Sequence, residues 1–497
     1  MLRQETHHNS LQVVDQETIN DGDLDNNGTI SSGVDRISAK SFSKLEKPQI
    51  SIFNLDASMR VDAASLTFMG YQVHNYVTDE QQSLAQQKRI TALLDTEASR
   101  TTVKPLEHKT VNMTSNVKSM IDMSQISMIM SESVAESSIE NSISLAAKDD
   151  LVNQSVTLSH LSKLIGQALK QKTEYHLIIY RADLMPGMTE NTLIPILEAA
   201  SEKRCGEHFG VCVVPCFLGN DASISDYYGA SKVIIGGNDN QATTIAGNLY
   251  KAHLNSAVEL TSLKNAESVK LIENSWRAMK QTFHNEIDRV CRAANIDVQE
   301  LLKFSGASTE SHLSTPHESN FSYGGTELEN DLSGISLLAK QYSVDLPLIE
   351  NLTNSYDAHI DYAVETIRRY GRRKIGILGL TTHFKNSAVG SNLHELTARL
   401  EKLGYEVQIF DPTAQSLQVQ VSDNLKGSSA NNPDDSIRVQ QDELQAQRCH
   451  SLDEFIRSND IVVQTSNDSL FASCEERARL KSTVINLVSG VTTAHES

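Results

Sequence analysis

The stretch AESVKLIENSWRAMKQTFHNEI, residues 266–287, decides the fold of this chain. Its apolar residues recur at three- and four-residue steps, the spacing of one helical face: Val269, Ile272, Trp276, Met279, Phe283 and Ile287. A second stripe is polar and holds Glu267, Lys270, Asn274 and Arg277. The pattern predicts a long helix with a buried apolar face and a polar stripe that forms one wall of a site. On periodicity alone, a plain scaffold helix is the more common outcome.

Composition limits the classes of function. A chain of 497 residues, 39% of them hydrophobic, predicts about three domains. The formal net charge of -19 argues against binding to nucleic acid or to an anionic membrane. The six cysteines include no CxxC pair, which indicates thiols in a reducing compartment. The start lacks the apolar core of a signal peptide, and no run reaches the length of a membrane span. We therefore expect a cytoplasmic protein.

Residues 1–47 are polar, and we expect them to form a disordered tail. Within them Asp23, Asp25, Asn27 and Gly28 follow the opening of an EF-hand calcium loop. The twelfth position, which needs a bidentate carboxylate, is Val34. We therefore expect no metal site.

The segment from residue 48 to about 255 opens as strand, helix and strand, with QISIF at 49–53 and YQVHNYV at 71–77. A dinucleotide-binding unit of this kind needs G-x-G-x-x-G in its first turn, so that the backbone approaches the pyrophosphate. Asn54, Asp56 and Met59 occupy those three positions. Val77 stands where an acidic residue would bind the adenosine ribose. The strands therefore predict a Rossmann-like fold, whereas the NAD-binding signature is missing.

The order of residues in the central helix is more specific than its periodicity. Glu-x-x-Lys-x-x-x-Asn, followed by Trp-x-x-x-Lys-x-x-Phe-x-Asn-Glu, resembles the UDP-glucose/GDP-mannose 6-dehydrogenase family, and its GDP-mannose members most. The resemblance implies that Lys270 and Asn274 face the sugar carbon that is oxidised. It also implies substrate-binding roles for Arg277 and Asn285.

FSYGGTELEND, residues 321–331, resembles the family's Gly-Gly-Ser-Cys-x-x-Lys-Asp motif. In the family, NAD oxidises the C6 hydroxyl to an aldehyde, the Cys captures it, and a second NAD yields a thioester that water hydrolyses. Gly324 and Gly325, at substrate-binding positions, and Asp331 match the motif. Glu327 stands at the nucleophile position, and a carboxylate cannot replace a thiolate in this chemistry. Asn330 stands in place of the motif's Lys.

Two further stretches resemble motifs of the family's first domain. In YHLIIYRADLMPGMT, the residues Pro186, Gly187 and Thr189 correspond to a Pro-Gly-Thr turn, with Thr189 at a cofactor position, while Ala182 and Asp183 replace a hydroxyl pair. FGVCVVPCFL resembles a strand that ends in Asn-Pro-Glu-Phe-Leu. Cys216 stands at the Glu that assists the hydrolytic water. Among apolar neighbours, a buried structural Cys is the more frequent outcome than a reactive thiol.

The resemblance covers roughly 450 residues in order. It implies an α/β protein in which two Rossmann-like domains, 48–255 (NAD-type) and 373–497 (nucleotide-sugar-type), flank a central all-helical dimerisation domain, 256–372. In the last domain, KIGILGL opens a strand–helix–strand unit whose helix buries Leu393, Leu396, Leu400 and Leu403. Residues 413–448 are polar and predict a surface loop.

The departures from the family fall on site residues, whereas strand cores and helix faces persist. We therefore expect a catalytically impaired homologue, retained as a structural or regulatory partner in exopolysaccharide precursor synthesis. Its partner would be a second copy or an active paralogue, joined through the middle helices. Two alternatives stay open: an NAD-dependent enzyme with a reorganised site, and a sensor that binds a nucleotide sugar without catalysis.

Overall fold

The computed structural model describes the residues in these ranges: 47–53, 60–78, 80–100, 111–131, 143–217, 223–229, 232–251, 257–294, 296, 300, 326–378, 391–410, 447–448, 451–465, 474, 477–478, 482–487 and 492–493. The tail before residue 47, with its calcium-loop pattern, lies outside this part. So do residues 413–446 of the polar loop.

The first sheet is a doubly wound Rossmann-type sheet with the strand order β3-β2-β1-β4-β5-β6-β7-β8. Its pairs are parallel except for β6 and β7. The chain reverses its direction of growth between β1 and β4, and ligands of such sheets bind at the carboxyl ends of the strands at this switch point. The strands are β1 (Gln49–Phe53), β2 (Gln72–Tyr76), β3 (Asn112–Thr114), β4 (Ile126–Ser131), β5 (His176–Ala182), β6 (Phe209–Val213), β7 (Lys232–Gly237) and β8 (Ala257–Thr261).

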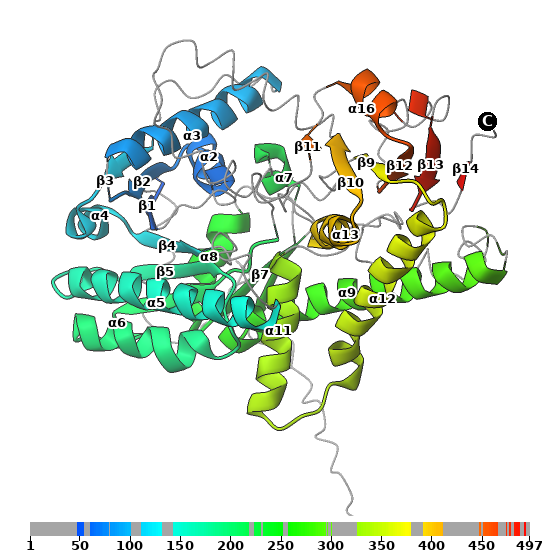
Figure 1. Ribbon diagram of the computed structural model, residues 1–497. Coiled ribbons are helices and arrows are strands. Elements are labelled where there is room, and N and C mark those ends of the chain that lie inside the picture. Colours follow the sequence, from blue (N-terminus) through cyan, green and yellow to red (C-terminus); the bar gives the residue numbers. More distant parts are fainter. Residues whose placement is uncertain are drawn as a thin grey trace, which may run out of the picture. The chain divides into compact units, whose positions relative to one another are not determined.

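Helices cover both faces of this sheet and enclose two apolar cores (Figure 1). One face packs against α2 (Arg60–Phe68), α3 (Glu80–Arg100), α7 (Ile224–Tyr228) and α8 (Asn240–Lys251). The other packs against α4 (Val117–Met123), α5 (Ile143–Leu169), the π-helical turn η1 (Thr189–Leu193), α6 (Ile194–Ser201) and the start of α9. As the sequence predicts, α2 stops before Gly70, whose φ of 87° suits glycine.

The central helix α9 (Leu263–Ala294) is longer than the periodic stretch that predicts it. Its first turn packs closely on β7, because a Cβ at Gly236 would lie 2.6 Å from the Ala266 Cβ. Two further helices, α11 (Thr326–Gln341) and α12 (Pro347–Arg368), contact α9. Between α9 and α12 the described residues of this middle region are mainly helical, as expected, but Ala257–Thr261, placed in the helical domain by the sequence, form β8 of the first sheet because they pair with β7.

The second sheet has the order β11-β10-β9-β12-β13-β14, and only β13 and β14 pair antiparallel. Its strands are β9 (Lys374–Leu378), β10 (Glu406–Phe410), β11 (Gln447–Arg448), β12 (Ile461–Gln464), β13 (Thr483–Asn486) and β14 (Thr492–Thr493). Helices α12 and α13 (Ser391–Lys402) cover one face, and α16 (Leu452–Ser458) packs on the other. The predicted fold class, two Rossmann-like units with a helical middle, is therefore confirmed.

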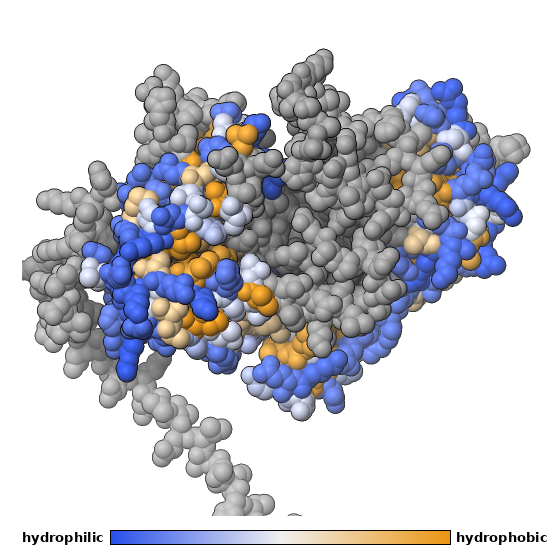
Figure 2. Space-filling model, turned by 60° about the vertical axis from the view of Figure 1, so that its left-hand side comes forward, coloured by the Kyte–Doolittle hydropathy of each residue, from blue (hydrophilic) through white to orange (hydrophobic). Residues whose placement is uncertain are grey.

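The sequence prediction for the buried face of α9 is wrong. Ile272, Trp276 and Phe283 are 60%, 44% and 58% exposed, whereas Lys270 and Asn274 of the polar stripe are buried. The packing of α11 against the polar side explains the reversal, because the polar groups find their partners there. Figure 2 shows apolar patches within a mostly hydrophilic surface.

One residue of the last domain also departs from its prediction. Leu393, Leu396 and Leu400 are buried, but Leu403 is 55% exposed. The reason is that α13 ends at Lys402, and the chain turns at Gly404 with a φ of 85°.

Candidate functional site

A small cavity lies where the end of β5 and the loop after it meet α9 and α11. Its volume is about 20 Å³, which accommodates about one water molecule. Segments far apart in the sequence line it: Ala182, Asp183, Leu184, Met185, Pro215, Ala266, Glu267, Lys270, Leu271 and Asp331. It therefore lies at the carboxyl edge of the first sheet, the edge that binds ligands in folds of this kind.

An ion pair between α9 and the loop after β5 dominates this cavity. The Lys270 Nζ donates to both carboxylate oxygens of Asp183, at 2.8 Å to Oδ1 and 2.7 Å to Oδ2. The two side chains are only 11% and 14% exposed. Charge-assisted hydrogen bonds are about twice as strong as neutral ones. A neutral substrate oxygen therefore competes poorly with Asp183 for the ammonium group.

A carboxylate of α9, that of Glu267, also holds the loop after β5. The Glu267 side chain accepts hydrogen bonds from the backbone N–H of Gly187 at 2.5 Å and of Thr189 at 2.8 Å. Burial raises the pKa of Glu267, while the bonds to Thr189 and Gly187 oppose that rise. Gly187 adopts a φ of 90°, which favours glycine and lets both N–H groups face the carboxylate. The turn is therefore held rigidly against α9.

A third contact joins α9 to α11. The Asn274 Nδ2 donates to Asp331 Oδ2, and the Arg277 guanidinium donates to Asn274 Oδ1 at 3.1 Å. Asn274 and Asp331 are both buried. Lys270 and Asp331 thus line one cavity, and Asn274 contacts Asp331, with Arg277 beside it.

Other residues predicted for the site lie elsewhere. Asn285 is buried three turns further along α9, about 16 Å from Asn274 at 1.5 Å per residue, and pairs with Gln281. Cys216 is 3% exposed in the apolar core on the α8 side of the sheet, as predicted for a structural cysteine. Thr189 is buried beside the cavity, one position later than the motif count, because Met188 follows Gly187.

Several predicted site residues lie outside the described part of the chain: Asn54, Asp56, Met59, Gly324 and Gly325. Glu327 belongs to the first turn of α11, and its side chain is not described. Among the residues that are described, no group of three acidic, His or Cys side chains is placed to hold a metal ion.

Sequence reasoning missed the partner of Lys270. The signal was available in YRADL, where Arg181 and Asp183 follow a run of buried apolar residues. Charges in such a segment require partners, because an unpaired buried charge is costly. Arg181 pairs with Asp62 of α2, and Asp183 pairs with Lys270. Neither pairing follows from sequence spacing, since each joins residues at least 87 positions apart.

Two described residues, Val77 and Asp62, lie near the switch point. Val77 is buried at the end of β2 and has no side-chain acceptor for ribose hydroxyls. Asp62 places a carboxylate in the first turn of α2, where a Rossmann unit binds the cofactor's diphosphate. Asp62 is 0% exposed and paired with Arg181 of β5, and the turn of residues 54–59 lies outside the described part of the chain.

Two family models match the chain. Residues 64–254 match the NAD-binding domain of the UDP-glucose/GDP-mannose dehydrogenase family, and residues 264–357 match its central domain. The first match begins beyond the glycine-free turn of residues 54–59.

Curated relatives agree with these matches. The GDP-mannose 6-dehydrogenase of Pseudomonas putida is 31% identical over 328 residues, which cover 65% of this chain and 72% of the relative. That of Pseudomonas aeruginosa is 29% identical over 328 residues, with the same coverage. A UDP-glucose dehydrogenase from Pyrobaculum islandicum, at 17% identity, has the same fold, with a TM-score of 0.69 over 89% of this chain and 94% of the other.

No helix in the described residues is long and apolar enough to cross a membrane.

Proposed function

The chain belongs to the UDP-glucose/GDP-mannose dehydrogenase family, and we propose that it is a catalytically impaired member. In this proposal it serves as a structural or regulatory partner in exopolysaccharide precursor synthesis. It would act in the cytoplasm, where nucleotide sugars are made.

The Lys270–Asp183 ion pair carries this proposal. By resemblance, Lys270 is the cation that faces the sugar carbon, and here it donates two hydrogen bonds, at 2.8 and 2.7 Å, to the carboxylate of Asp183. The cavity around it, at about 20 Å³, is far smaller than the roughly 300 Å³ or more of ordinary ligand pockets. A substrate would have to displace a charged side chain that is mostly buried.

The sequence supports the same conclusion for the second oxidation. A thioester intermediate requires a thiolate nucleophile, and Glu327 stands at that position. Lys270, the group for the first oxidation, is therefore paired with Asp183. Glu327, at the nucleophile position for the second oxidation, is a carboxylate where the chemistry requires a thiolate.

The apolar stripe of α9 supports a role as a partner. Ile272, Trp276, Phe283 and Val290 are between 44% and 62% exposed and follow one helical face. A large exposed apolar stripe on a helix marks an interaction surface. We propose that it pairs with the corresponding helix of a second copy or of an active paralogue.

Measurements of turnover and of ligand binding on the full chain test the proposal that it is catalytically impaired. We expect no NADH formation with NAD and either UDP-glucose or GDP-mannose, and no heat of binding for NAD alone or with the sugar nucleotide present. Glu327→Cys restores only the nucleophile, so we expect it to remain inactive while Asp183 pairs with Lys270. NADH formation by the unmodified chain would overturn the proposal.

Co-expression with an active family member tests the proposal that this chain serves as a partner through the exposed stripe of α9. We expect the two chains to copurify and expect Phe283→Glu on this chain to separate them. Leu348→Glu is the matched control, because Leu348 is equally exposed at 58% but lies on α12. Equal loss of association in both variants, or no association at all, would contradict the assignment of this surface. Binding of a nucleotide sugar without NAD would instead favour a sensor.

A further inference from the structure

The turn between α12 and β9 (Figure 1) carries a dense group of positive charges, which we call the basic turn. Five of the seven residues from 368 to 374 are cations, and all five are exposed: Arg368, Arg369, Arg372, Arg373 and Lys374. Acids outnumber bases in the chain as a whole, whose formal net charge is -19. Like charges at such close spacing repel one another, so the arrangement costs stability unless an anion offsets it.

Backbone hydrogen bonds hold the basic turn in one conformation. At the end of α12, the N–H of Arg369 donates to the Glu365 carbonyl at 3.2 Å. Gly371 then adopts a φ of 63°, which favours glycine and turns the chain toward β9. Just before β9, the Arg373 carbonyl accepts a hydrogen bond from the N–H of Glu406 at 2.9 Å. A fixed backbone therefore carries the cationic side chains, which lowers the entropic cost of binding a partner.

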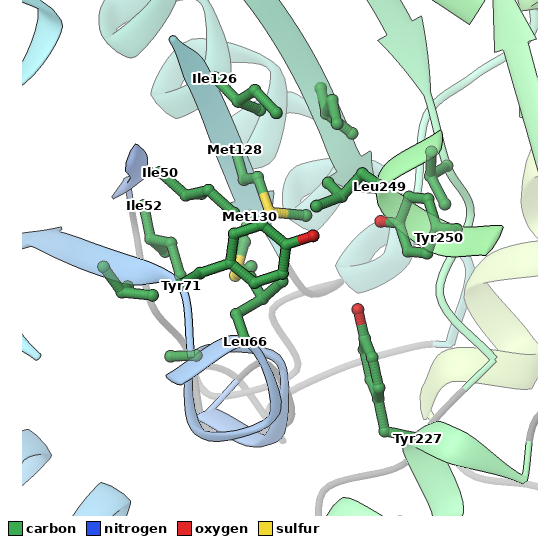
Figure 3. Packing of buried hydrophobic residues seen from close by; sticks show 14 of the residues in the cluster. Ile50, Ile52, Leu66, Tyr71, Ile126, Met128, Met130, Tyr227, Leu249 and Tyr250 are labelled. Carbon is green, nitrogen blue, oxygen red and sulfur yellow. The ribbon is translucent and has the colours of Figure 1, made fainter. Parts of the chain in front are cut away.

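Most cations of the basic turn make no ion pair with an acid in the described part of the chain. Arg368 does so, with Glu365 at 3.6 Å, and both of these side chains are more than half exposed. Arginines elsewhere are paired more closely. Arg181, beside Tyr227 of the apolar core that Figure 3 shows, pairs with Asp62. The basic turn therefore differs from the other arginine sites in having positive charge to spare.

Two local effects account for part of this arrangement. Cations near the C-terminus of a helix interact favourably with its dipole, which accounts for the two arginines at the end of α12. Lys374 has exposed acids close by, in Glu406 and Asp460, whose N–H donates to the Lys374 carbonyl at 2.9 Å. Neither effect applies to Arg372 and Arg373, which lie between the helix and the strand.

The surroundings of the basic turn indicate the class of partner. Small ligands bind in concave pockets, whereas these cations are exposed on a turn. Membrane binding needs an apolar anchor beside the basic residues, and Tyr370, the aromatic residue of the turn, packs against the core of the last domain. The net charge of -19 opposes the approach of a nucleic acid. A short acidic segment carries few charges, and guanidinium groups bind carboxylates through two parallel hydrogen bonds.

We propose that the basic turn is a docking site for an acidic segment of another protein, with Arg369, Arg372 and Arg373 as its main contacts. The turn lies at the amino edge of the second sheet, because β9 begins there, whereas ligands of Rossmann-type sheets bind at the carboxyl edge. It uses none of the residues of the cavity around Lys270 or of the α9 stripe. The docking site therefore does not rest on the proposed function, and either can be correct without the other.

Fluorescence anisotropy on the full chain tests the proposal, with a fluorescein-labelled oligoglutamate peptide as the probe. We expect saturable binding at low salt that weakens by about threefold or more in 1 M NaCl, because exposed ion pairs are screened. The triple variant Arg369→Gln/Arg372→Gln/Arg373→Gln should bind the peptide about tenfold more weakly at low salt, because it loses three exposed ion pairs.

A charge-matched control removes cations elsewhere. The variant Arg204→Gln/Lys232→Gln/Lys251→Gln loses three exposed cations of the first domain and should bind the peptide like the original chain. Equal weakening in both triple variants would show attraction to positive charge in general and would overturn the proposal, as would no binding by the original chain. Tighter binding of a short oligothymidine than of the peptide, lost in the variant of the basic turn, would assign the site to nucleic acid instead.

Thermal unfolding separates docking from a structural role. The described hydrogen bonds of the basic turn are made by its backbone, so the triple variant should keep or raise its Tm once the repelling charges are removed. A lower Tm with unchanged peptide binding would mean that these arginines are structural and would overturn the proposal. If the triple variant does not fold, the single variants Arg372→Gln and Arg373→Gln replace it. Each should weaken peptide binding by about twofold, and unchanged binding in both counts against the docking site.

Discussion

Both carboxylate oxygens of Asp183 lie within 2.8 Å of the Lys270 ammonium group, although the two residues are 87 positions apart in the sequence. The loop after β5 brings Asp183 to α9, and the bonds from Gly187 and Thr189 to Glu267 hold that loop in place. The ion pair thereby forms part of the contact between the first sheet and α9.

Removal of one member of this pair should destabilise the chain. For Asp183→Asn we expect the free energy of unfolding to fall by about 3 kcal/mol, because Lys270 is left mostly buried without its counter-charge. Urea unfolding of Asp183→Asn, Lys270→Met and the double variant measures the coupling. We expect the double variant to lose at least about 1 kcal/mol less than the sum of the two single losses. Additive losses would show that the pair contributes no mutual stabilisation.

The exposed stripe of α9 predicts a change of assembly without a change of fold. Phe283→Glu adds a charge to a side chain that is 58% exposed, so the stability of a single chain should stay within about 0.5 kcal/mol of the original. If copies pair through this stripe, light scattering after size exclusion should show a shift from dimer to monomer. An unchanged mass would locate any self-association on another surface.

Arg399 joins two helices of the last domain through three carboxylates. Its guanidinium contacts Glu395 of α13 at 2.6 Å and, on α12, Asp361 at 2.6 Å and Asp357 at 2.8 Å. The Arg399 side chain is 26% exposed and the acids are more so, so screening limits the gain. For Arg399→Met we expect a loss of about 1 kcal/mol in unfolding free energy at low salt, and a smaller loss in 1 M NaCl. A loss that does not depend on salt would indicate packing of the aliphatic stem instead.

The buried His176 predicts a dependence of stability on pH. Burial lowers the pKa of His176 to about 3, with a contribution from the nearby Lys172, and its Nε2 lies 2.8 Å from Ser127 Oγ. The unfolded chain, with a His pKa of about 6.5, binds a proton at a pH where the folded chain does not. Stability from this residue is therefore complete above pH 6.5 and decreases as the pH falls toward 3, by up to about 1.4 kcal/mol per pH unit.

Unfolding of His176→Asn between pH 7 and pH 4.5 checks this dependence. The difference in unfolding free energy between the original chain and the variant should shrink as the pH falls. His208→Asn, at a half-exposed histidine, is the control for the substitution itself. A constant difference between the original chain and His176→Asn would contradict the prediction.

The α9 helix shows which structural features the local sequence pattern predicts and which it does not. Spacing at three and four residues predicted the helix correctly, because helical periodicity depends only on the backbone. The prediction of the buried stripe was wrong, because burial depends on the side chains that the neighbouring helix presents. Helix α11 presents Asp331 to Asn274, so the polar stripe is buried and Trp276 is left 44% exposed.

The features of the candidate site likewise fall into two groups, those that the sequence determines and those that tertiary packing determines. The sequence by itself determined the strands, the turn at Gly187 and the types of residue at the family's catalytic positions, because each is set by local composition or by residue order. Only the tertiary structure decided that Asp183 pairs with Lys270 and Asp62 with Arg181. Ion pairs between distant segments depend on the approach of β5 to α9 and α2, and that approach is set by the packing of the whole sheet rather than by any short stretch of sequence.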